Sequence, residues 1–532
     1  MLNNFANDNS AYHDCAIQGS CSIDPILYSL MEIMFYELKQ ITYYIVKMQE
    51  LGYVNHSLND KILNYLSMII VGYEFSRKEF ETILKDINTE KNNVQKIFIK
   101  ICEEKNLDCQ ILKSPVKFEK FDFSTIVTEG EKQALLRNRT LSSETRNLSE
   151  IILQLIKSAS MRLIELKSYK DNCDKEERAI LKLFNSLNFT SISDQKLIKK
   201  INDFAKINYD IHQKLLKTKE NAYGKIKLRK ISCDIKKGPA ILASGQNLKE
   251  FELMLNAVEG SDINVYTHDS LVIAHSFPKF AEYKNLAGHW QKSLDNFQLD
   301  FESFKGAILI TKNSQHKFDR LLRGRIFTTN IISGKGMKKI VKYDFKPLMD
   351  AAHAAEGFAK DEKQKCIVVG YDEEKIMEKV DDIIEKIKNK EIKNLFIVGL
   401  MNHSLVASEY FKDIVENIPD DSYVISTAIK SKKENVFHID SFFNTSLIYK
   451  ILNRLKKQIN LEEFPVTVFL TRCNLHTISH LFSLRHLGIK NIYLPVCSAD
   501  IVTPNMINFL ADKFGFLKIT GNPKKDLQNV IQ

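Results

Sequence analysis

The chain of 532 residues lacks a hydrophobic run long enough to cross a membrane. Its longest apolar stretch lies near Tyr65–Tyr73, whereas a transmembrane helix needs roughly 18 apolar residues. The N-terminus also lacks the basic segment and the apolar segment that make up a secretory signal. These absences argue against a membrane-spanning or secreted protein, so the sequence predicts a cytoplasmic location without a membrane partner.

Cysteine is sparse, with nine residues scattered over the chain. Such scatter is typical of a protein in a reducing compartment rather than of a disulfide framework. A basic stripe interleaved with aromatic residues is also missing, as is zinc-finger spacing. The formal net charge is +10, but lysine and glutamate are mixed along the chain, which indicates solvated loops and helix faces. Binding of nucleic acid or of another acidic partner is therefore the weakest of the alternatives.

Glycine is scarce and strand signals are weak over roughly the first 225 residues. Asp24 and Pro25 resemble a helix N-cap followed by proline at the first helical position. Apolar residues then recur at steps of three and four from Leu27 to Met48, which predicts one face of an amphipathic helix. Similar patterns follow, so residues 1–228 are predicted to form a helical bundle.

Short apolar runs that end in turns begin near Lys237 and alternate with helical patterns. The first series contains GPAILASG, DINVYTH, GAILITKN and RIFTTN, and the second contains KCIVVGY, NLFIVGL, SYVIST, VTVFLT and KNIYLPV. This alternation favours parallel sheets with helices on both faces. A multidomain α and α/β protein is expected, with two Rossmann-like α/β domains over residues 229–363 and 364–532, because one hydrophobic core cannot serve so long a chain.

Several longer motifs resemble one known family. They are DCAIQGSCSIDP near the N-terminus, VYTHDSLVIAHSFPKFAEYKNLAGHW, RIFTTNIISGKG and FPVTVFLTRCNLHTISHLFSLRHLGIKNI. In order and spacing they are similar to the hybrid cluster proteins, or hydroxylamine reductases, over nearly the whole chain. The resemblance implies a helical domain and two α/β domains. It also implies two metal centres: a cubane iron–sulfur cluster near the N-terminus, and an iron–sulfur–oxygen hybrid cluster that reduces small nitrogen compounds.

Alignment with that family puts other residue types at the hybrid-cluster ligand positions. The seven aligned positions are Gln246, Ser270, Ser314, Met401, Ile429, Asn444 and Asn474, and His476 stands where the family has a lysine. The cubane site keeps only two of its four cysteines, Cys15 and Cys21, at the spacing the family uses.

Iron–sulfur clusters are held by thiolates, and histidine or carboxylate replaces only some of them. Neutral amide and hydroxyl groups are poor iron ligands, and Met401 offers only a weak thioether. The sequence therefore predicts a pseudoenzyme without an expected cofactor, which acts as a binding or scaffold protein for an unidentified protein partner. An iron–sulfur cluster would form only if another chain, as in a homodimer, completed the site of Cys15 and Cys21.

Two alternatives remain open. The first is an oxidoreductase of the hydroxylamine or nitric oxide reductase type with a diverged metal centre, and the second is the basic binding protein already described. Cys473 and His476 lie one helical turn apart and could form half of a zinc site or a Cys–His nucleophilic pair, or could belong to the core. His268 is interpreted as a hydrogen-bonded structural histidine rather than a base.

Overall fold

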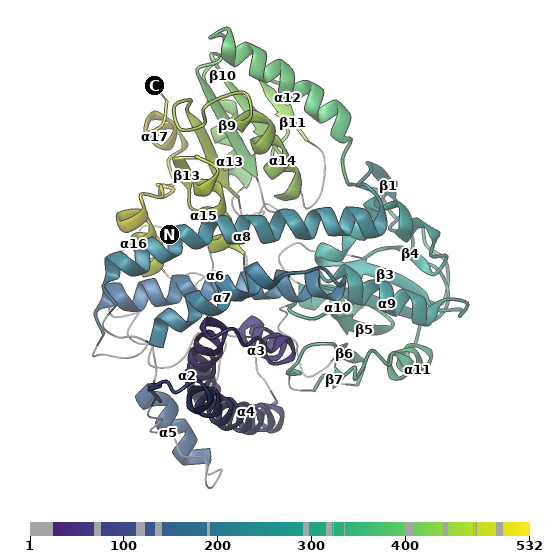
Figure 1. Ribbon diagram of the computed structural model, residues 1–532. Coiled ribbons are helices and arrows are strands. Elements are labelled where there is room, and N and C mark those ends of the chain that lie inside the picture. The colour runs from purple at the N-terminus through teal and green to yellow at the C-terminus, as the bar shows by residue number, and fades with distance from the viewer. Residues whose placement is uncertain are drawn as a thin grey trace. The chain divides into compact units, whose positions relative to one another are not determined.

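A computed structural model describes most of the chain (Figure 1). The described residues are 25–68, 76–112, 123–133, 141–188, 192–290, 297–314, 322, 324–334, 336–399, 408–439, 445–471, 473, 476–495 and 504–531. They fall into two compact units. One contains the residues up to Leu215 and the short segment that begins at Ile331, and the other contains the remainder from Leu216 onward. Among the described helices, none is both long and apolar enough to span a membrane.

The N-terminal part is helical, as the sequence predicts. Its helices are α2 (Pro25–Glu50), α3 (His56–Met68), α4 (Arg77–Glu104), α5 (Phe123–Gln133), α6 (Ser143–Ser168), α7 (Asp174–Asn185) and α8 (Asp194–Tyr223), with a short 3-10 turn, η2 (Ser186–Asn188). From Leu30 onward, the apolar positions predicted for the first helix are buried in α2; Leu30, Leu38 and Ile41, for example, are fully buried. Burial of each such side chain contributes roughly 1.5–3 kcal/mol, so α2 is a central element of the helical unit.

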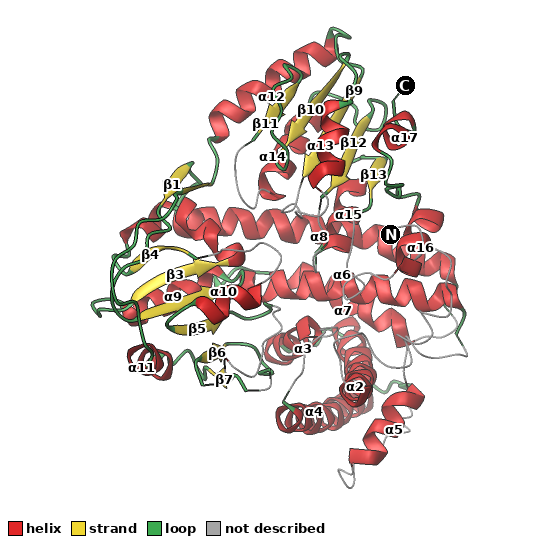
Figure 2. Cartoon of the chain, turned by 180° about the vertical axis from the view of Figure 1, so that it is seen from behind, coloured by secondary structure: helices red, strands yellow, loops and turns green. Residues whose placement is uncertain are grey.

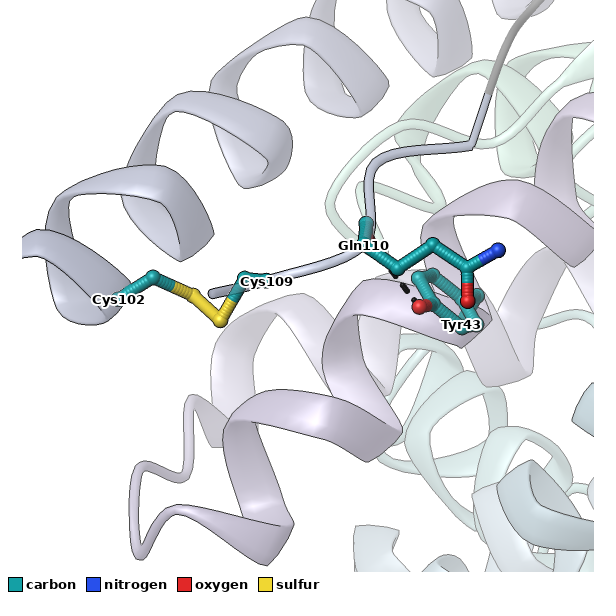
Figure 3. Close-up of a disulfide and its surroundings, with 4 residues drawn as sticks. All are labelled: Tyr43, Cys102, Cys109 and Gln110. Atoms are coloured by element: carbon teal, nitrogen blue, oxygen red, sulfur yellow. Dashed lines mark hydrogen bonds between the residues drawn. A yellow bond between two sulfur atoms is a disulfide. The ribbon is translucent and has the colours of Figure 1, made fainter. Parts of the chain in front are cut away.

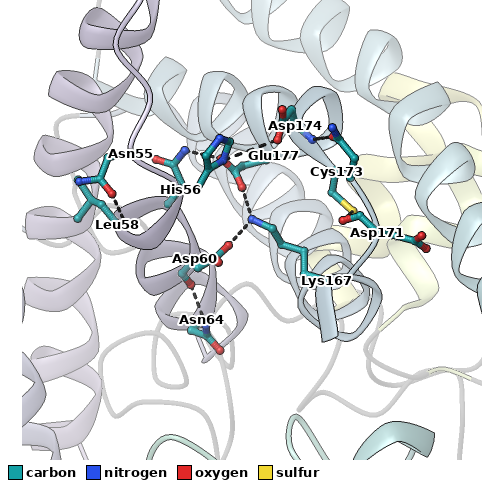
Figure 4. A network of polar contacts seen from close by, with 12 residues as sticks. Asn55, His56, Leu58, Asp60, Asn64, Lys167, Asp171, Cys173, Asp174 and Glu177 are labelled. Carbon is teal, nitrogen blue, oxygen red and sulfur yellow. Dashed lines mark hydrogen bonds and ion pairs between the residues drawn. The ribbon is translucent and has the colours of Figure 1, made fainter. Parts of the chain in front are cut away.

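A polar network ties α3 to α6 and α7 (Figure 4). The ammonium group of Lys167 on α6 pairs with the carboxylates of Asp60 on α3 and Glu177 on α7. Glu177 also accepts a hydrogen bond from the side-chain amide of Asn59, and His56 Nδ1 lies 3.7 Å from Asp174 Oδ1. Because Glu177 is only 1% exposed, its charge is compensated within the network rather than by water.

The first sheet contains six parallel strands in the order β4-β3-β2-β5-β6-β7 (Figure 2). Its strands are β2 (Ala240–Ser244), β3 (Asn264–His268), β4 (Leu286–His289), β5 (Ala307–Ile310), β6 (Ile326–Thr328) and β7 (Lys338–Lys339). The helical segments between and after them are α9 (Leu248–Val258), η3 (Asp269–Ser276), η4 (Pro278–Glu282), α10 (Phe297–Ser303) and α11 (Lys346–Ala354). Every residue of β2 and β5 is buried, as expected for central strands covered on both faces.

The second sheet has five parallel strands in the order β11-β10-β9-β12-β13. They are β9 (Asn394–Gly399), β10 (Ser422–Ser426), β11 (Val436–His438), β12 (Val466–Leu470) and β13 (Asn491–Tyr493). Its helices are α12 (Glu373–Lys388), α13 (Ser408–Glu416), α14 (Thr445–Lys456), α15 (Thr477–His486), α16 (Pro504–Phe514) and α17 (Pro523–Gln528). The predicted fold class, a helical part followed by α/β parts with parallel sheets, is confirmed.

One predicted strand has a different role. The run KCIVVGY forms β8 (Ile367–Val369), which pairs antiparallel with β1 (Arg229–Ile231) in a separate two-stranded sheet instead of beginning the second parallel sheet. The helix predicted after it is present as α12. The division into three domains stays a prediction, since the two sheets belong to one compact unit.

Candidate functional site

The carboxyl ends of β2, β3 and β5 lie side by side in the first sheet. Ser244, the last residue of β2, is in register with His268 on β3 and with Ile310 on β5. The sequence positions Gln246, Ser270 and Ser314 follow these three strand ends by two to four residues. In doubly wound sheets this edge is where ligands bind.

Gln246, after β2, contacts the segment that connects β12 to α15 in the second sheet. Its side-chain oxygen lies 3.3 Å from Nε2 of His476, which directly precedes α15 after the end of β12. Its side-chain amide donates to the carbonyl of Asn313, and its backbone N–H donates to Thr311 Oγ1. The structure thus brings together two of the sequence-predicted positions that are 230 residues apart.

Ser314 is buried and contacts Thr311, whose hydroxyl also accepts a hydrogen bond from the Gln246 backbone. The two hydroxyl oxygens are 3.1 Å apart, and Thr311 Oγ1 donates to the carbonyl of Ser244. Gly245, between Ser244 and Gln246, has a φ of +128° and faces both hydroxyl groups. The cluster is therefore closely packed around a glycine.

Replacing Gly245 with alanine is expected to lower the free energy of unfolding by about 2 kcal/mol. The added Cβ would clash with Ser314 Oγ and Thr311 Oγ1, and the φ of Gly245 is one that L side chains rarely adopt. Urea unfolding of the two proteins measures the loss. Gly260→Ala is the matched control, because its φ of +80° is also positive but its Cβ would meet nothing within 4 Å; equal losses would show that crowding at Gly245 is unimportant.

His268 is fully buried between two polar partners. Its Nδ1 lies 2.7 Å from Ser244 Oγ, and its Nε2 lies 3.3 Å from Asp300 Oδ2 on α10. Because Ser244, His268 and Asp300 are all fully buried, the interpretation of a structural histidine is favoured over that of a base. Ser270 is next to Asp269, a residue with positive φ, and its hydroxyl donates to the Asp269 carboxylate over 3.4 Å.

Ile429 lies in the hydrophobic core of the second sheet. It is 7% exposed and belongs to the same buried cluster as Phe396, Val398 and Phe469, while its backbone N–H donates to Ser426 Oγ. A hydrocarbon side chain in this setting offers no ligand to a metal.

Cys473 and His476 do not form a nucleophilic pair. Cys473 is buried and disulfide-bonded, so it does not present a free thiol. His476 contacts Gln246, and its ring centroid lies 6.3 Å from that of His480, one turn later on α15. His480 is in turn 2.8 Å from the Tyr449 hydroxyl through Nδ1.

Sequence reasoning missed a buried carboxylate near this edge. Glu250 on α9 accepts hydrogen bonds from Thr329 Oγ1 at 2.5 Å, from the Lys312 backbone N–H at 2.7 Å and from the Tyr343 hydroxyl at 3.2 Å. Burial raises its pKa, which these hydrogen bonds partly oppose. The available signal was the helix start: Asn247 is the N-cap, so Glu250 occupies the third helical position, where glutamate is favoured.

Five sequence-predicted positions lie outside the described residues: Cys15, Cys21, Met401, Asn444 and Asn474. Within the described residues, no group of three or more histidine, cysteine, aspartate or glutamate side chains could hold a metal ion.

Comparison with known proteins identifies the family to which the chain is similar. The model of the Prismane/CO dehydrogenase family matches residues 10–528. A hydroxylamine reductase from Thermodesulfovibrio yellowstonii is 31% identical over 311 residues, which cover 56% of this chain and 58% of that relative. Hydroxylamine reductases from Clostridium novyi and Halothermothrix orenii are 24% and 23% identical over 546 residues, each covering 97% of this chain.

The expectation that the protein has no cofactor is wrong for the family. The matches extend over nearly the whole chain, and the family implied by the resemblance carries iron–sulfur clusters. The described donors nevertheless do not fit the family's hybrid cluster. Gln246, Ser270 and Ser314 offer an amide and two hydroxyl groups that are hydrogen-bonded within the protein, and Ile429 offers none. Thiolate ligands are absent from these four described positions.

Proposed function

Since this chain belongs to the Prismane/CO dehydrogenase family, we propose that it is an oxidoreductase of the hydroxylamine reductase type with a diverged metal centre. Two relatives that carry the name hydroxylamine reductase align over 97% of the chain, which supports this class of activity better than a loss of activity. The cytoplasmic location stays a prediction.

The observation that carries the proposal is the contact between Gln246 and His476 at the carboxyl edge of the first sheet. Gln246 and His476 would bind a small polar molecule such as hydroxylamine by exchanging the hydrogen bond between them for hydrogen bonds to that molecule. Among the described residues, Gln246 and His476 are assigned the binding and orientation of the substrate. We assign no reaction step to a particular metal ligand.

Two measurements on anaerobically purified full-length protein test the proposal. The first determines iron and acid-labile sulfide per chain, and the second follows reduction of hydroxylamine to ammonia and water, with two electrons from reduced viologen and two protons. Iron and turnover are both expected. A folded protein with neither iron nor turnover would refute the proposal.

Replacing His476 with glutamine is expected to lower kcat/KM for hydroxylamine by roughly tenfold to a hundredfold, a range typical of groups that orient a reacting partner. The matched control is His353→Gln on α11, because the His353 side chain is 46% exposed and pairs with Asp262 instead of Gln246. An unchanged kcat/KM in the His476 variant would show that this histidine does not bind or orient the substrate.

A second candidate is a binding or scaffold protein of the same fold. It is favoured by the side chains at the aligned positions, since Ile429 fills part of an apolar core and Gln246, Ser270 and Ser314 are neutral. Its partner would be another protein, and a homodimer would be one form of it. The metal and turnover measurements separate the two candidates.

A further inference from the structure

We propose that Cys102 and Cys109 form a reversible thiol–disulfide site that controls how firmly residues 107–112 are attached to the end of α4. The two cysteines are disulfide-bonded, seven residues apart, with their Cα atoms at 6.0 Å (Figure 3). The proposal concerns the helical unit and is independent of the proposed function.

The backbone holds the two cysteines close together by contacts other than the sulfur–sulfur bond. Cys102 lies in the last turn of α4, and the chain reverses at Asn106, whose φ of +51° is left-handed. The Leu107 N–H then donates to the Cys102 carbonyl over 2.9 Å. These contacts close a short loop, so the two thiols of a reduced pair would stay near each other and re-form the bond with a low entropic cost.

The two sulfur-bearing residues differ in exposure. Cys102 is only 4% exposed, whereas Cys109 is half-buried between the exposed residues Asp108 and Gln110. An incoming thiolate therefore reaches Cys109 more readily than Cys102. Disulfide exchange depends on such access to one sulfur.

The chemistry needs a dithiol as reductant. One of its thiolates attacks Cys109 Sγ, the bond to Cys102 breaks, and the Cys102 thiolate takes up a proton. The second thiolate of the dithiol then attacks the mixed disulfide and releases Cys109, which is also protonated. The protein disulfide gains two electrons and two protons, and the dithiol becomes a disulfide.

The segment after Cys109 has a second attachment, to α2. The Tyr43 hydroxyl donates to the Gln110 carbonyl over 3.1 Å (Figure 3), and the Leu112 N–H donates to the Tyr44 hydroxyl over 3.1 Å. Burial raises the pKa of both tyrosines, so both hydroxyls stay protonated at neutral pH. Reduction removes the covalent attachment and leaves these hydrogen bonds to hold residues 107–112.

The test equilibrates the full-length protein with mixtures of reduced and oxidised dithiothreitol, traps free thiols with a maleimide and maps the peptides by mass. Hydrogen exchange of the Leu112 amide is followed in the same samples. We expect the pair to convert between dithiol and disulfide, with exchange faster by roughly tenfold or more in the reduced form.

The double variant Cys102→Ser/Cys109→Ser should show the faster exchange under all redox conditions, whereas Cys366→Ser, which removes an exposed free cysteine, should behave like the unaltered protein. A bond that stays intact at every ratio of dithiothreitol would overturn the proposal. So would a reduced protein whose Leu112 amide exchanges at the oxidised rate, since the disulfide would then control nothing.

Discussion

Replacing Lys157 with methionine is expected to remove the part of the unfolding free energy that falls as the pH drops from the ordinary pKa of lysine toward 7. Lys157 lies on α6 and is only 1% exposed, and this burial lowers the pKa of its amine to about 7. In the unfolded chain the amine keeps its ordinary high pKa and binds a proton at neutral pH. The unfolded state therefore gains stability relative to the folded state, and methionine removes that difference.

The pH dependence of the unfolding free energy tests the expectation for Lys157. A depressed folded pKa means that stability is fully present above the unfolded pKa of Lys157, falls as the pH drops toward 7 and levels off below it. Urea unfolding at several pH values should show this slope in the unaltered protein and a smaller slope in Lys157→Met. Lys182→Met on α7 is the control, because Lys182 is exposed. An unchanged slope in Lys157→Met would show that the Lys157 amine does not cause this pH dependence.

Replacing Lys91 with methionine is expected to destabilise the helical unit by about 3–5 kcal/mol. Lys91 on α4 is 5% exposed, and its Nζ lies 2.5 Å from Oε2 of Glu37 on α2, which is fully buried. Burial raises the pKa of Glu37, and Lys91 opposes that rise. Without the ammonium group, a buried carboxylate would lack its counter-charge.

The Lys91 effect should depend on pH. Loss of Lys91 raises the pKa of Glu37 further, and a protonated glutamic acid needs no counter-charge, so the destabilisation should shrink as the pH falls through that raised pKa. A double-mutant cycle with Glu37→Gln, followed by urea unfolding, measures the coupling between the two groups. Additive effects of the two substitutions would show that the pair contributes no coupling energy.

Much of the fold could be predicted from local patterns. The three- and four-residue steps after Pro25 correspond to α2, and the runs GPAILASG and NLFIVGL correspond to the buried strands β2 and β9. These signals are readable because burial of one helix face leaves a period of three to four residues, and burial of a whole strand leaves a continuous apolar run. The antiparallel pairing of KCIVVGY leaves no such period, since it depends on Arg229–Ile231, far away in the chain.

The candidate site was predictable only in part. The resemblance to the hybrid cluster proteins identified Gln246, Ser270 and Ser314, and these positions follow the carboxyl ends of neighbouring parallel strands, where ligands bind in such sheets. The contact of Gln246 with His476 joins residues 230 positions apart, which no local pattern encodes. The disulfide of Cys102 and Cys109 was missed for a different reason: the expectation of reduced cysteines came from their scatter over the whole chain, while the pairing depends on a single turn at the end of α4.

The pairing of β1 with β8 brings together the points at which the chain enters and leaves the first parallel sheet. Arg229 is in register with Val369 and Ile231 with Ile367, so residues 232–366 form an excursion whose two ends meet. A segment with adjacent ends can be gained, lost or permuted in evolution with little effect on the path of the rest of the chain. The two short strands thus give residues 232–366 the adjacent ends that domain insertion and circular permutation require.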